Sequence, residues 1–227
     1  MAREAKYMRI ATWNCCRGSH ASKLPPLLKL NPDIAVIQES PKPLKKLADY
    51  QLWHGTNLHQ GLLVLSFNGW QLEKAPPLRR YPEFFLPIRV TRRNQQFNLL
   101  AAWVKAGTKY PLYCSTILEG LRIYDKFIRL FPTVLAGDLN TDECKDEISK
   151  LGLISAYHHF HKAEIGDEKH FTFHLTYNEK KPYHYDYCYV PKEWRRRIES
   201  VKVGGYAKWR SYSDHFPIVV DIKDTRA

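Results

Sequence analysis

Short apolar runs of strand length, each closed by a polar or turn-forming residue, recur along this 227-residue chain and constrain its fold more than any other feature. Residues 8–13 (MRIATW) are rich in β-branched and aromatic side chains, and residues 33–38 (DIAVIQ) form an apolar run too short for a typical helix. Both patterns predict strands, the second one buried on both faces. Further strands are predicted at residues 61–67, 84–91, 97–105, 112–116, 133–136, 183–190 and 217–222.

Helical spacing is found between these runs, at residues 21–30, 118–130 and 142–151. Strands and helices occur in two similar halves, which predicts an α/β fold in which two sheets pack face to face with helices on the outside. No internal repeat, low-complexity segment or long Gly/Ser/Pro linker interrupts the pattern. We therefore expect residues 1–227 to form a single domain.

The chain is strongly basic. Lysine and arginine number 35 against 23 aspartates and glutamates, which gives a formal net charge of +12. A surface of this sign attracts polyanions, and nucleic acid is the obvious candidate. An excess of lysine that only aids solubility would give the same net charge, so charge alone leaves both interpretations open.

Cysteine usage and hydropathy bear on the cellular compartment. The five cysteines form an odd set without a Cys-x-x-Cys pair, which predicts neither a disulfide framework nor a zinc ribbon. The first residues include no apolar stretch of signal-peptide length, and no apolar run approaches the roughly 20 residues that cross a bilayer. We expect a soluble, cytoplasmic, monomeric protein that does not contact a membrane.

Polar residues at the ends of the apolar runs indicate one shared site. A strand end is a rigid platform that can aim a short side chain at a common pocket. Taken one at a time, such residues are also explained as helix caps, turns or solvated carboxylates. As an ordered set they are more specific. The set comprises Asn14 in TWNCC, Glu39 in VIQES, Asp138 and Asn140 in LAGDLNT, Asp186 in YHYDYCYV, and Asp214 and His215 in YSDHFP.

In this order, WN, QE, GDLNT, an Asp-Tyr between apolar residues and a carboxy-terminal SDHFP resemble the endonuclease/exonuclease/phosphatase family. The resemblance extends from Trp13 to Pro217, and GDLN and SDH are its most specific motifs. The family includes abasic-site endonucleases, exonuclease III, DNase I, tyrosyl-DNA phosphodiesterases, inositol phosphatases and sphingomyelinases. The resemblance implies a DNase I-like two-sheet α/β sandwich and a metal-assisted attack of water on a phosphorus centre.

The resemblance also implies roles for the matching residues. Asp138 would orient and deprotonate the attacking water, and Asn140 would help to hold the water or the substrate phosphate. His215 would bind the phosphate and stabilise its developing negative charge, while Asp186 would orient the imidazole and favour its cationic form. A buried, hydrogen-bonded core pair is the alternative interpretation of His215 and Asp186.

A metal site is expected at Asn14, Glu39 and Asp214. Carboxylate and amide oxygens are hard ligands that suit Mg²⁺, which binds through one or two carboxylates together with waters and substrate phosphate oxygens. Mn²⁺ is expected to substitute for Mg²⁺. Asn14 is also expected to contact the substrate.

This chain lacks one motif of the family, and the missing motif narrows the choice between the branches of the family. The phosphatase and sphingomyelinase branches usually have an N-x-H motif before the GDxN segment, whereas this chain has KYPLYCSTILEG there. We expect a tyrosine to fill the space, with Tyr113 in a catalytic role or Tyr110 against the substrate. The missing histidine favours the DNA-acting branch.

Histidines and arginines in the second half of the chain extend the candidate site. Residues 156–161 (AYHHFH) are followed by further histidines up to His184, which suggests a second metal site as one interpretation. Their spacings match no helical HExxH motif, which favours packing among aromatic residues instead. His184 is expected to line the substrate pocket, and Arg195 and Arg196 to contact backbone phosphates.

These observations favour a Mg²⁺-dependent phosphodiesterase that hydrolyses nucleic acid, with DNA and DNA repair as the first expectation. A phosphatase or phosphodiesterase acting on a small phosphorylated molecule or a lipid headgroup is the second hypothesis. A nucleic-acid-binding protein without catalysis is the third, and the complete set of polar residues disfavours it. Endonuclease and exonuclease activity are not distinguished, because the loops between strands decide such preferences.

Overall fold

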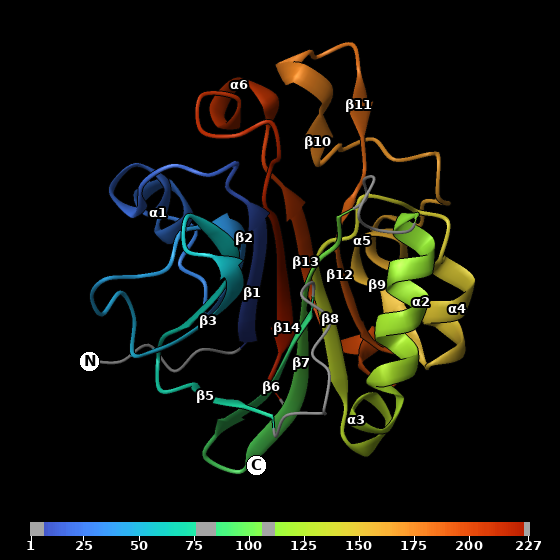
Figure 1. Ribbon diagram of the computed structural model, residues 1–227. Helices are drawn as coiled ribbons and strands as arrows, with labels where there is room; N and C mark the ends of the chain where they lie inside the picture. The colour runs from blue at the N-terminus through green and yellow to red at the C-terminus, as the bar shows by residue number, and fades with distance from the viewer. Residues whose placement is uncertain (1–6, 76–84, 106–111, 225–227) are drawn as a thin grey trace.

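The described residues form two six-stranded sheets that pack face to face (Figure 1), and residues 50–57, 71–74, 153–155 and 198–203 join them although no strand is predicted there. The computed structural model describes residues 7–75, 85–105 and 112–224. The strand order is β13-β14-β1-β2-β4-β3 in the first sheet and β5-β6-β7-β8-β12-β9 in the second. The first sheet consists of β1 (Tyr7–Asn14), β2 (Ile34–Ser40), β3 (Tyr50–Asn57), β4 (Gln60–Ser66), β13 (Ile198–Val203) and β14 (Ile218–Lys223). The second consists of β5 (Gln71–Lys74), β6 (Phe85–Arg92), β7 (Gln95–Trp103), β8 (Thr133–Asp138), β9 (Leu153–Ser155) and β12 (Asp186–Pro191).

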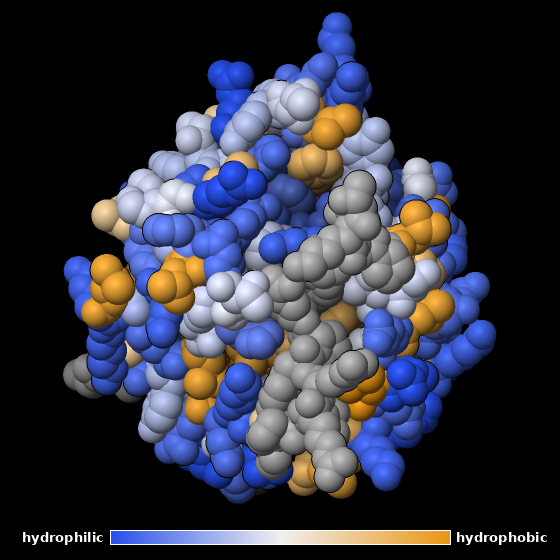
Figure 2. Space-filling view, in the orientation of Figure 1, coloured by the Kyte–Doolittle hydropathy of each residue, from blue (hydrophilic) through white to orange (hydrophobic). Residues whose placement is uncertain are grey.

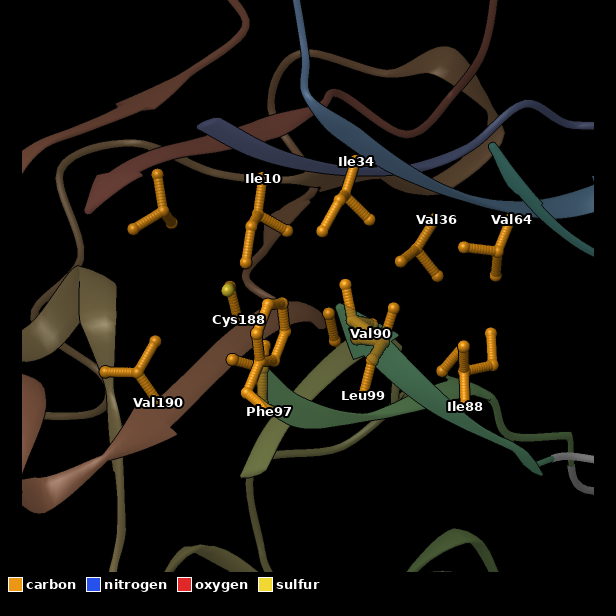
Figure 3. Packing of buried hydrophobic residues seen from close by; sticks show 14 of the residues in the cluster. Ile10, Ile34, Val36, Val64, Ile88, Val90, Phe97, Leu99, Cys188 and Val190 are labelled. Carbon is orange, nitrogen blue, oxygen red and sulfur yellow. The ribbon is translucent and has the colours of Figure 1, made fainter. Parts of the chain in front are cut away.

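The main core lies between the inner faces of the two sheets. Side chains at alternate strand positions point inward because successive residues of a strand face opposite sides. Figure 3 shows how the aliphatic side chains of β1, β2 and β4 meet those of β6, β7 and β12. Burial of each such side chain stabilises the fold by about 1.5–3 kcal/mol, so the strands that end at the site are held rigidly. The labelled residues are Ile10, Ile34, Val36, Val64, Ile88, Val90, Phe97, Leu99, Cys188 and Val190.

Helices cover the outer faces, as the sequence predicts. Helix α1 (His20–Leu28) buries Leu24 and Leu27 against the first sheet. On the second sheet, α2 (Tyr113–Ile123), α3 (Asp125–Leu130) and α4 (Lys145–Lys150) contribute Ile117, Ile128 and Ile148 to a separate apolar cluster. The remaining elements are short. Their bounds are α5 (Ala156–His161), α6 (Tyr206–Trp209), the 3₁₀ turns η1 (Leu175–Tyr177) and η2 (Lys192–Arg197), and the hairpin strands β10 (Phe173–His174) and β11 (Pro182–Tyr183).

The prediction of a strand at residues 112–116 is wrong, because this segment begins helix α2. Its aromatic and β-branched residues favour a strand locally. However, Thr116, Ile117, Gly120 and Leu121 are buried and have helical spacing, and Ile117 and Leu121 belong to the cluster on the outer face of the second sheet. Tertiary packing therefore overrides the local propensity.

The predicted strand at residues 183–190 is divided. Residues up to Tyr183 pair with β10, whereas β12 begins at Asp186 and pairs with β8 and β9. The interruption at His184 and Tyr185 moves the chain from the small hairpin into the large sheet, and it places Asp186 at the first position of β12.

A disulfide joins Cys114 in α2 to Cys144 before α4, across a sequence separation of 30 residues. The cysteine count predicted no disulfide framework, and this single disulfide was not anticipated. The count could not reveal the pairing, because it depends on how α2 and the loop after β8 pack on the same face. Separately, no helix in the described part of the chain combines the length and apolar character that crossing a bilayer requires.

Candidate active site

The strand ends predicted to carry functional side chains lie together at one end of the two packed sheets. β1 and β2 run parallel, so Asn14 and Glu39 lie at the same end of the first sheet. In the second sheet the last residue of β8, Asp138, is paired with the first residue of β12, Asp186. β14 runs antiparallel to β1, so its first residue, Ile218, lies at the same end of the sheet. His215 precedes β14 and lies there too. Sheet topology thus gathers residues that are far apart in the sequence.

The amide of Asn14 links two carboxylates. Its Nδ2 donates to Asp138 Oδ2 at 2.9 Å and to Glu39 Oε1 at 3.3 Å, while its Oδ1 accepts from the backbone N–H of Cys16 at 3.0 Å. Gln60 Nε2 donates to the other oxygen of Glu39 at 3.3 Å. Asn14 is 1% exposed and Asp138 is 1% exposed, so the amide offsets the cost of placing two carboxylates close together.

Backbone geometry fixes these side chains at the strand ends. Glu39 and Asn140 have left-handed backbone conformations, with φ of 57° and 55°. Such residues cost of order 1–3 kcal/mol of strain and cluster at functional sites. Gly137, at φ 152°, is needed for another reason: a Cβ there would lie 1.8 Å from the carbonyl oxygen of Ala102 in β7. The glycine of the GDLN motif therefore lets β8 lie close to β7, and Asp138 follows it as the last residue of β8.

His215 lies between two buried carboxylates. Its Nδ1 donates to Asp186 Oδ2 at 2.8 Å, and its Nε2 lies 4.0 Å from Asp138 Oδ2. Burial by itself would lower the pKa of His215, but the charges of Asp186 and Asp138 outweigh it and raise that pKa to about 10. Burial also raises the pKa of Asp138, to about 7, although the nearby His215 opposes the shift. His215 is thus a cation at neutral pH.

Residues from three segments hold His215 in place. The indole Nε1 of Trp13 donates to the carbonyl oxygen of His215 at 2.9 Å. Ser213 Oγ accepts from the backbone N–H of His215 at 3.0 Å and donates to the carbonyl oxygen of Asn14 at 2.8 Å. The ring of Phe173 packs against the imidazole at a centroid distance of 4.4 Å. The WN and SDH motifs are therefore hydrogen-bonded to each other directly.

The residues present fit a hard divalent cation at Glu39. Its carboxylate is 20% exposed at the rim, and its partners are two neutral amides and the exposed Arg17, 3.5 Å away. Burial is the largest cause that raises the pKa of the Cys16 thiol, and the charges of Asp214 and Glu39 raise it further, so both carboxylates lie near that thiol. Asp138, Asp186 and His215 also bring ligand atoms within 4.8 Å of one another. In that group Asp138 and Asp186 already accept hydrogen bonds from Asn14 and His215, whereas Glu39 is the more exposed carboxylate.

A cavity of about 290 Å³ opens beside Glu39. Tyr113, the first residue of α2, lines it together with Asn140, whose Nδ2 donates to the carbonyl oxygen of Val104 at 2.9 Å. Of the two tyrosines expected to replace the N-x-H histidine, Tyr113 is therefore at the cavity. Tyr110 lies outside the described residues. The other lining residues are Gln60, Trp103, Val104 and Lys105.

The structure does not bring His184 to the cavity as expected. Its side chain is buried against the ring of Tyr157 at 4.5 Å, and its Nδ1 donates to the carbonyl oxygen of His170 at 3.0 Å. The neighbouring histidines are also held by protein groups: His158 Nε2 donates to Glu168 at 2.8 Å, and His161 Nε2 donates to the carbonyl oxygen of Val201 at 3.1 Å. These contacts pack α5 into the molecule.

Arg195 and Arg196 lie away from the cavity. They belong to η2, which follows the far end of β12 from Asp186. At about 3.3 Å per residue, that strand separates η2 from Asp186 by about 17 Å. Trp194 anchors η2 against Phe97, with a centroid distance of 5.6 Å, near the end of β7 opposite Trp103. The run of positive charge in the sequence could not reveal where Arg195 and Arg196 lie, because the direction of β12 decides which end of the sheet η2 occupies.

Sequence reasoning missed several residues that shape the site. Ser213 and Trp13 stand inside the recognised motifs, so their neighbours were a usable signal. No motif near Gln60 or Thr172 in the sequence indicated that they belong to the site. Thr172 is fully buried, and its Oγ1 accepts from the backbone N–H of Tyr185 and of Asp186, both at 3.0 Å.

Two six-stranded sheets packed face to face form a DNase I-like α/β sandwich, the fold of the solved structures that this chain resembles. An AP endonuclease from Archaeoglobus fulgidus matches with a TM-score of 0.69 and 19% identity, over 96% of this chain and 100% of that chain. A truncated TDP2 from Caenorhabditis elegans matches with a TM-score of 0.68 and 17% identity, over 96% and 98%.

A 3′-5′ exonuclease (NExo) from Neisseria meningitidis matches with a TM-score of 0.67 and 19% identity, over 96% of this chain and 100% of that chain. No protein-family model matches the sequence, and a search of curated proteins by sequence finds no match. The likeness therefore lies in the three-dimensional structure, at identities that establish the fold.

Proposed function

We propose that this protein is a Mg²⁺-dependent phosphodiesterase that hydrolyses phosphodiester bonds of nucleic acid, with DNA as the first candidate. The observation that carries the proposal is the continuous chain of contacts from Glu39 through Asn14 and Asp138 to His215 and Asp186. It combines a place for a hard cation, a buried base and a cationic donor within one site. Metal-assisted phosphoryl chemistry uses such components to activate the nucleophile and to stabilise negative charge.

In this mechanism Asp138 takes the proton from the attacking water. Burial makes its carboxylate more basic than an ordinary aspartate, and the Asn140 backbone N–H, which donates to Asp138 Oδ1 at 3.0 Å, holds it in one orientation. The 4.0 Å between His215 Nε2 and Asp138 Oδ2 exceeds a hydrogen bond. The cationic Nε2–H can therefore donate to a phosphate oxygen, and Tyr113 and Asn140 at the cavity supply further polar contacts.

Asp186 keeps the imidazole cationic and oriented through Nδ1. When bound at Glu39, with Asp214 as a second proposed ligand, Mg²⁺ or Mn²⁺ would neutralise negative charge on the phosphate. Asn14, expected as a ligand, turns its amide nitrogen toward Glu39 and its oxygen toward the Cys16 N–H, so it would orient the carboxylate instead of binding the cation. His215 would stabilise negative charge on the same phosphate through its Nε2–H. Electrostatic stabilisation of this kind is the largest part of phosphoryl-transfer catalysis.

Nucleic acid as the substrate is supported by the net charge of +12 and by the solved neighbours. These include AP endonucleases, a 3′-5′ exonuclease and a NExo structure bound to a product DNA hairpin. A role in DNA repair is part of the proposal on the same grounds. We further propose that the protein acts as a cytoplasmic monomer, which size-exclusion chromatography and fractionation would test.

The test is cleavage of labelled DNA and RNA oligonucleotides with Mg²⁺, with Mn²⁺ and with EDTA. Substrates with an internal abasic site, a plain 3′ end and a 3′ phosphate separate the activities, and inositol phosphates and sphingomyelin test the second hypothesis. Asp138→Asn should lower turnover by about 100-fold or more, whereas Asp142→Asn, on the exposed loop just beyond, should not. Hydrolysis of the small phosphates without oligonucleotide cleavage would overturn the proposal.

A further inference from the structure

A disulfide stands next to the candidate active site. It joins Cys114 to Cys144, with a Cα–Cα distance of 5.7 Å. Cys114 directly follows Tyr113, the first residue of α2, which lines the cavity. Cys144 lies four residues after Asn140, which lines the same cavity. The disulfide therefore links two of the segments that form the cavity wall.

The start of α2 is not capped. Leu112 precedes the helix and gives no side-chain hydrogen bond to its first N–H groups, and the first turn contains no acidic residue. A helix end of this kind lacks the groups that normally satisfy its N–H donors, and it is prone to fray. Leu112 is also 76% exposed, and Figure 2 shows hydrophobic residues at the surface over α2.

The later turns of α2 are anchored independently of the disulfide. Ile117 is fully buried, and Leu121 is 5% exposed in the same apolar cluster. Gly120 packs so closely against β6 that a Cβ there would lie 2.3 Å from the ring of Phe85. Loss of the disulfide would thus leave residues 120–123 in place and release the turn before them.

The loop that leads to Cys144 is held by its own hydrogen bonds. Asn140 donates two of them, from its backbone N–H at 3.0 Å and from its side-chain amide at 2.9 Å. Thr141 is 8% exposed, and its Oγ1 accepts from the backbone N–H of Glu143 at 3.2 Å. The disulfide thus ties an uncapped helix end to a fixed loop, and Tyr113 is the cavity residue that this tether positions.

The two halves of the disulfide differ in access. Cys114 is half-buried, whereas Cys144 is 2% exposed within the apolar cluster. The rate of thiol–disulfide exchange depends on which sulfur a thiolate can reach. A thiolate from solution would therefore attack the sulfur of Cys114, and Cys144 would be the leaving group.

We propose that Cys114 and Cys144 form a thiol–disulfide exchange site that takes a dithiol reductant and controls the position of Tyr113 at the cavity. The effect on turnover rests on the proposed function. One thiolate of the dithiol bonds to Cys114 Sγ, the bond to Cys144 breaks, and Cys144 leaves as a thiolate that takes up a proton. The second thiol of the reductant then displaces Cys114, so two electrons pass from the dithiol to the protein. Disulfides in a reducing compartment, such as the cytoplasm proposed above, are usually transient and redox-sensing.

Hydrogen exchange of the oxidised and the reduced protein tests the tether without any substrate. Dithiothreitol is the dithiol, and peptide mapping after alkylation identifies the bonded cysteines in each state. Reduction should speed amide exchange in residues 116–119 by about 10-fold or more, because their hydrogen bonds close the first turn onto residues 112–115. Residues 120–123 are the internal control and should change less than about 2-fold.

Cleavage of an oligonucleotide with Mg²⁺ tests the consequence for the site. Reduced wild-type protein should turn over about 10-fold more slowly than the oxidised protein, because a displaced group at the cavity is costly. Cys114→Ser should match the reduced wild type and should not respond to dithiothreitol. Cys144→Ala, which suits the apolar cluster, should behave in the same way and is a second variant in case one misfolds. Ser149→Ala, at an exposed position of α4, is the matched control and should respond as the wild type does.

Equal exchange of residues 116–119 in the two states overturns the proposal, and so does a disulfide that dithiothreitol leaves intact in the folded protein. A response to dithiothreitol that persists in both cysteine variants also overturns it, because the response would then arise elsewhere. Faster exchange with unchanged turnover would show that the tether does not control the site. The proposed function fails separately, if exchange differs as expected but neither the oxidised nor the reduced protein cuts any substrate.

Discussion

Thr172 Oγ1 accepts a 3.0 Å hydrogen bond from the backbone N–H of Asp186, the carboxylate that orients His215. The same residue accepts the backbone N–H of Phe216 on its carbonyl oxygen at 2.7 Å. One buried threonine thus connects the segment before β12 with the segment that carries His215. Its hydroxyl also satisfies the N–H of Tyr185, where the predicted strand is interrupted.

Thr172→Val should lower turnover by about 10- to 100-fold with little change in KM, because small displacements of a catalytic pair are costly. Valine keeps the shape of threonine but cannot accept the two N–H groups. Thr172→Ser, which keeps the hydroxyl, should retain most of the activity. Steady-state kinetics of both variants decides the matter, and equal losses in the two would assign Thr172 to packing alone.

Asp186→Asn and His215→Ala should each depress turnover severely, and the double variant should cost much less than the sum of the two losses. Both changes affect the same 2.8 Å contact and the same charged imidazole, and residues that act as a unit are non-additive. Single-turnover rates of the four proteins measure the coupling. Fully additive losses would mean that Asp186 does not act through His215.

Glu39→Gln should abolish activity at limiting Mg²⁺, by about 100-fold or more, and leave the fold intact. The variant exchanges an anionic ligand for a neutral amide of the same size at a residue on the rim of the cavity. Titration of activity with Mg²⁺ should show a higher requirement for the metal. Glu119→Gln, on the exposed face of α2, is the matched control, and an unchanged Mg²⁺ requirement in Glu39→Gln would refute the metal assignment.

The buried His184 should make the fold sensitive to mild acid. Burial lowers the pKa of His184 from 6.5 to about 4. Above pH 6.5 the folded and unfolded chains both hold it neutral, so it does not affect stability there. Between pH 6.5 and about 4 only the unfolded chain takes up the proton, and stability falls by up to about 3 kcal/mol as the pH decreases.

Urea unfolding at several pH values measures this effect. His184→Gln should show a shallower loss of unfolding free energy between pH 6.5 and pH 4 than the wild type. His159→Gln changes an exposed histidine of the same segment and should follow the wild type. Parallel curves for His184→Gln and the wild type would show that His184 does not carry the acid sensitivity.

The sequence by itself determined the apolar strands of the two-sheet core and the polar residues that close them, but not β3, β5, β9 or β13. Strands such as β1 and β2 were predictable because alternation and apolar runs are local patterns. The Asn14, Glu39, Asp138, Asp186 and His215 set was predictable in outline because motif order along the chain is also local information. Where the local pattern was ambiguous, as in the segment that became the first turn of α2, composition favoured the wrong element.

Only the tertiary structure decided which side chains meet. Thr172 and Asp186, or Gln60 and Glu39, are separated in sequence by loops whose course no local pattern specifies, and their hydrogen bonds exist only once the sheets have packed. The same holds for His184 and Arg196, which strand direction and burial place away from the cavity although their chemistry suits a phosphate site. Residue type fixes what a group can do, whereas the long-range packing of the two sheets fixes which groups are close enough to do it together.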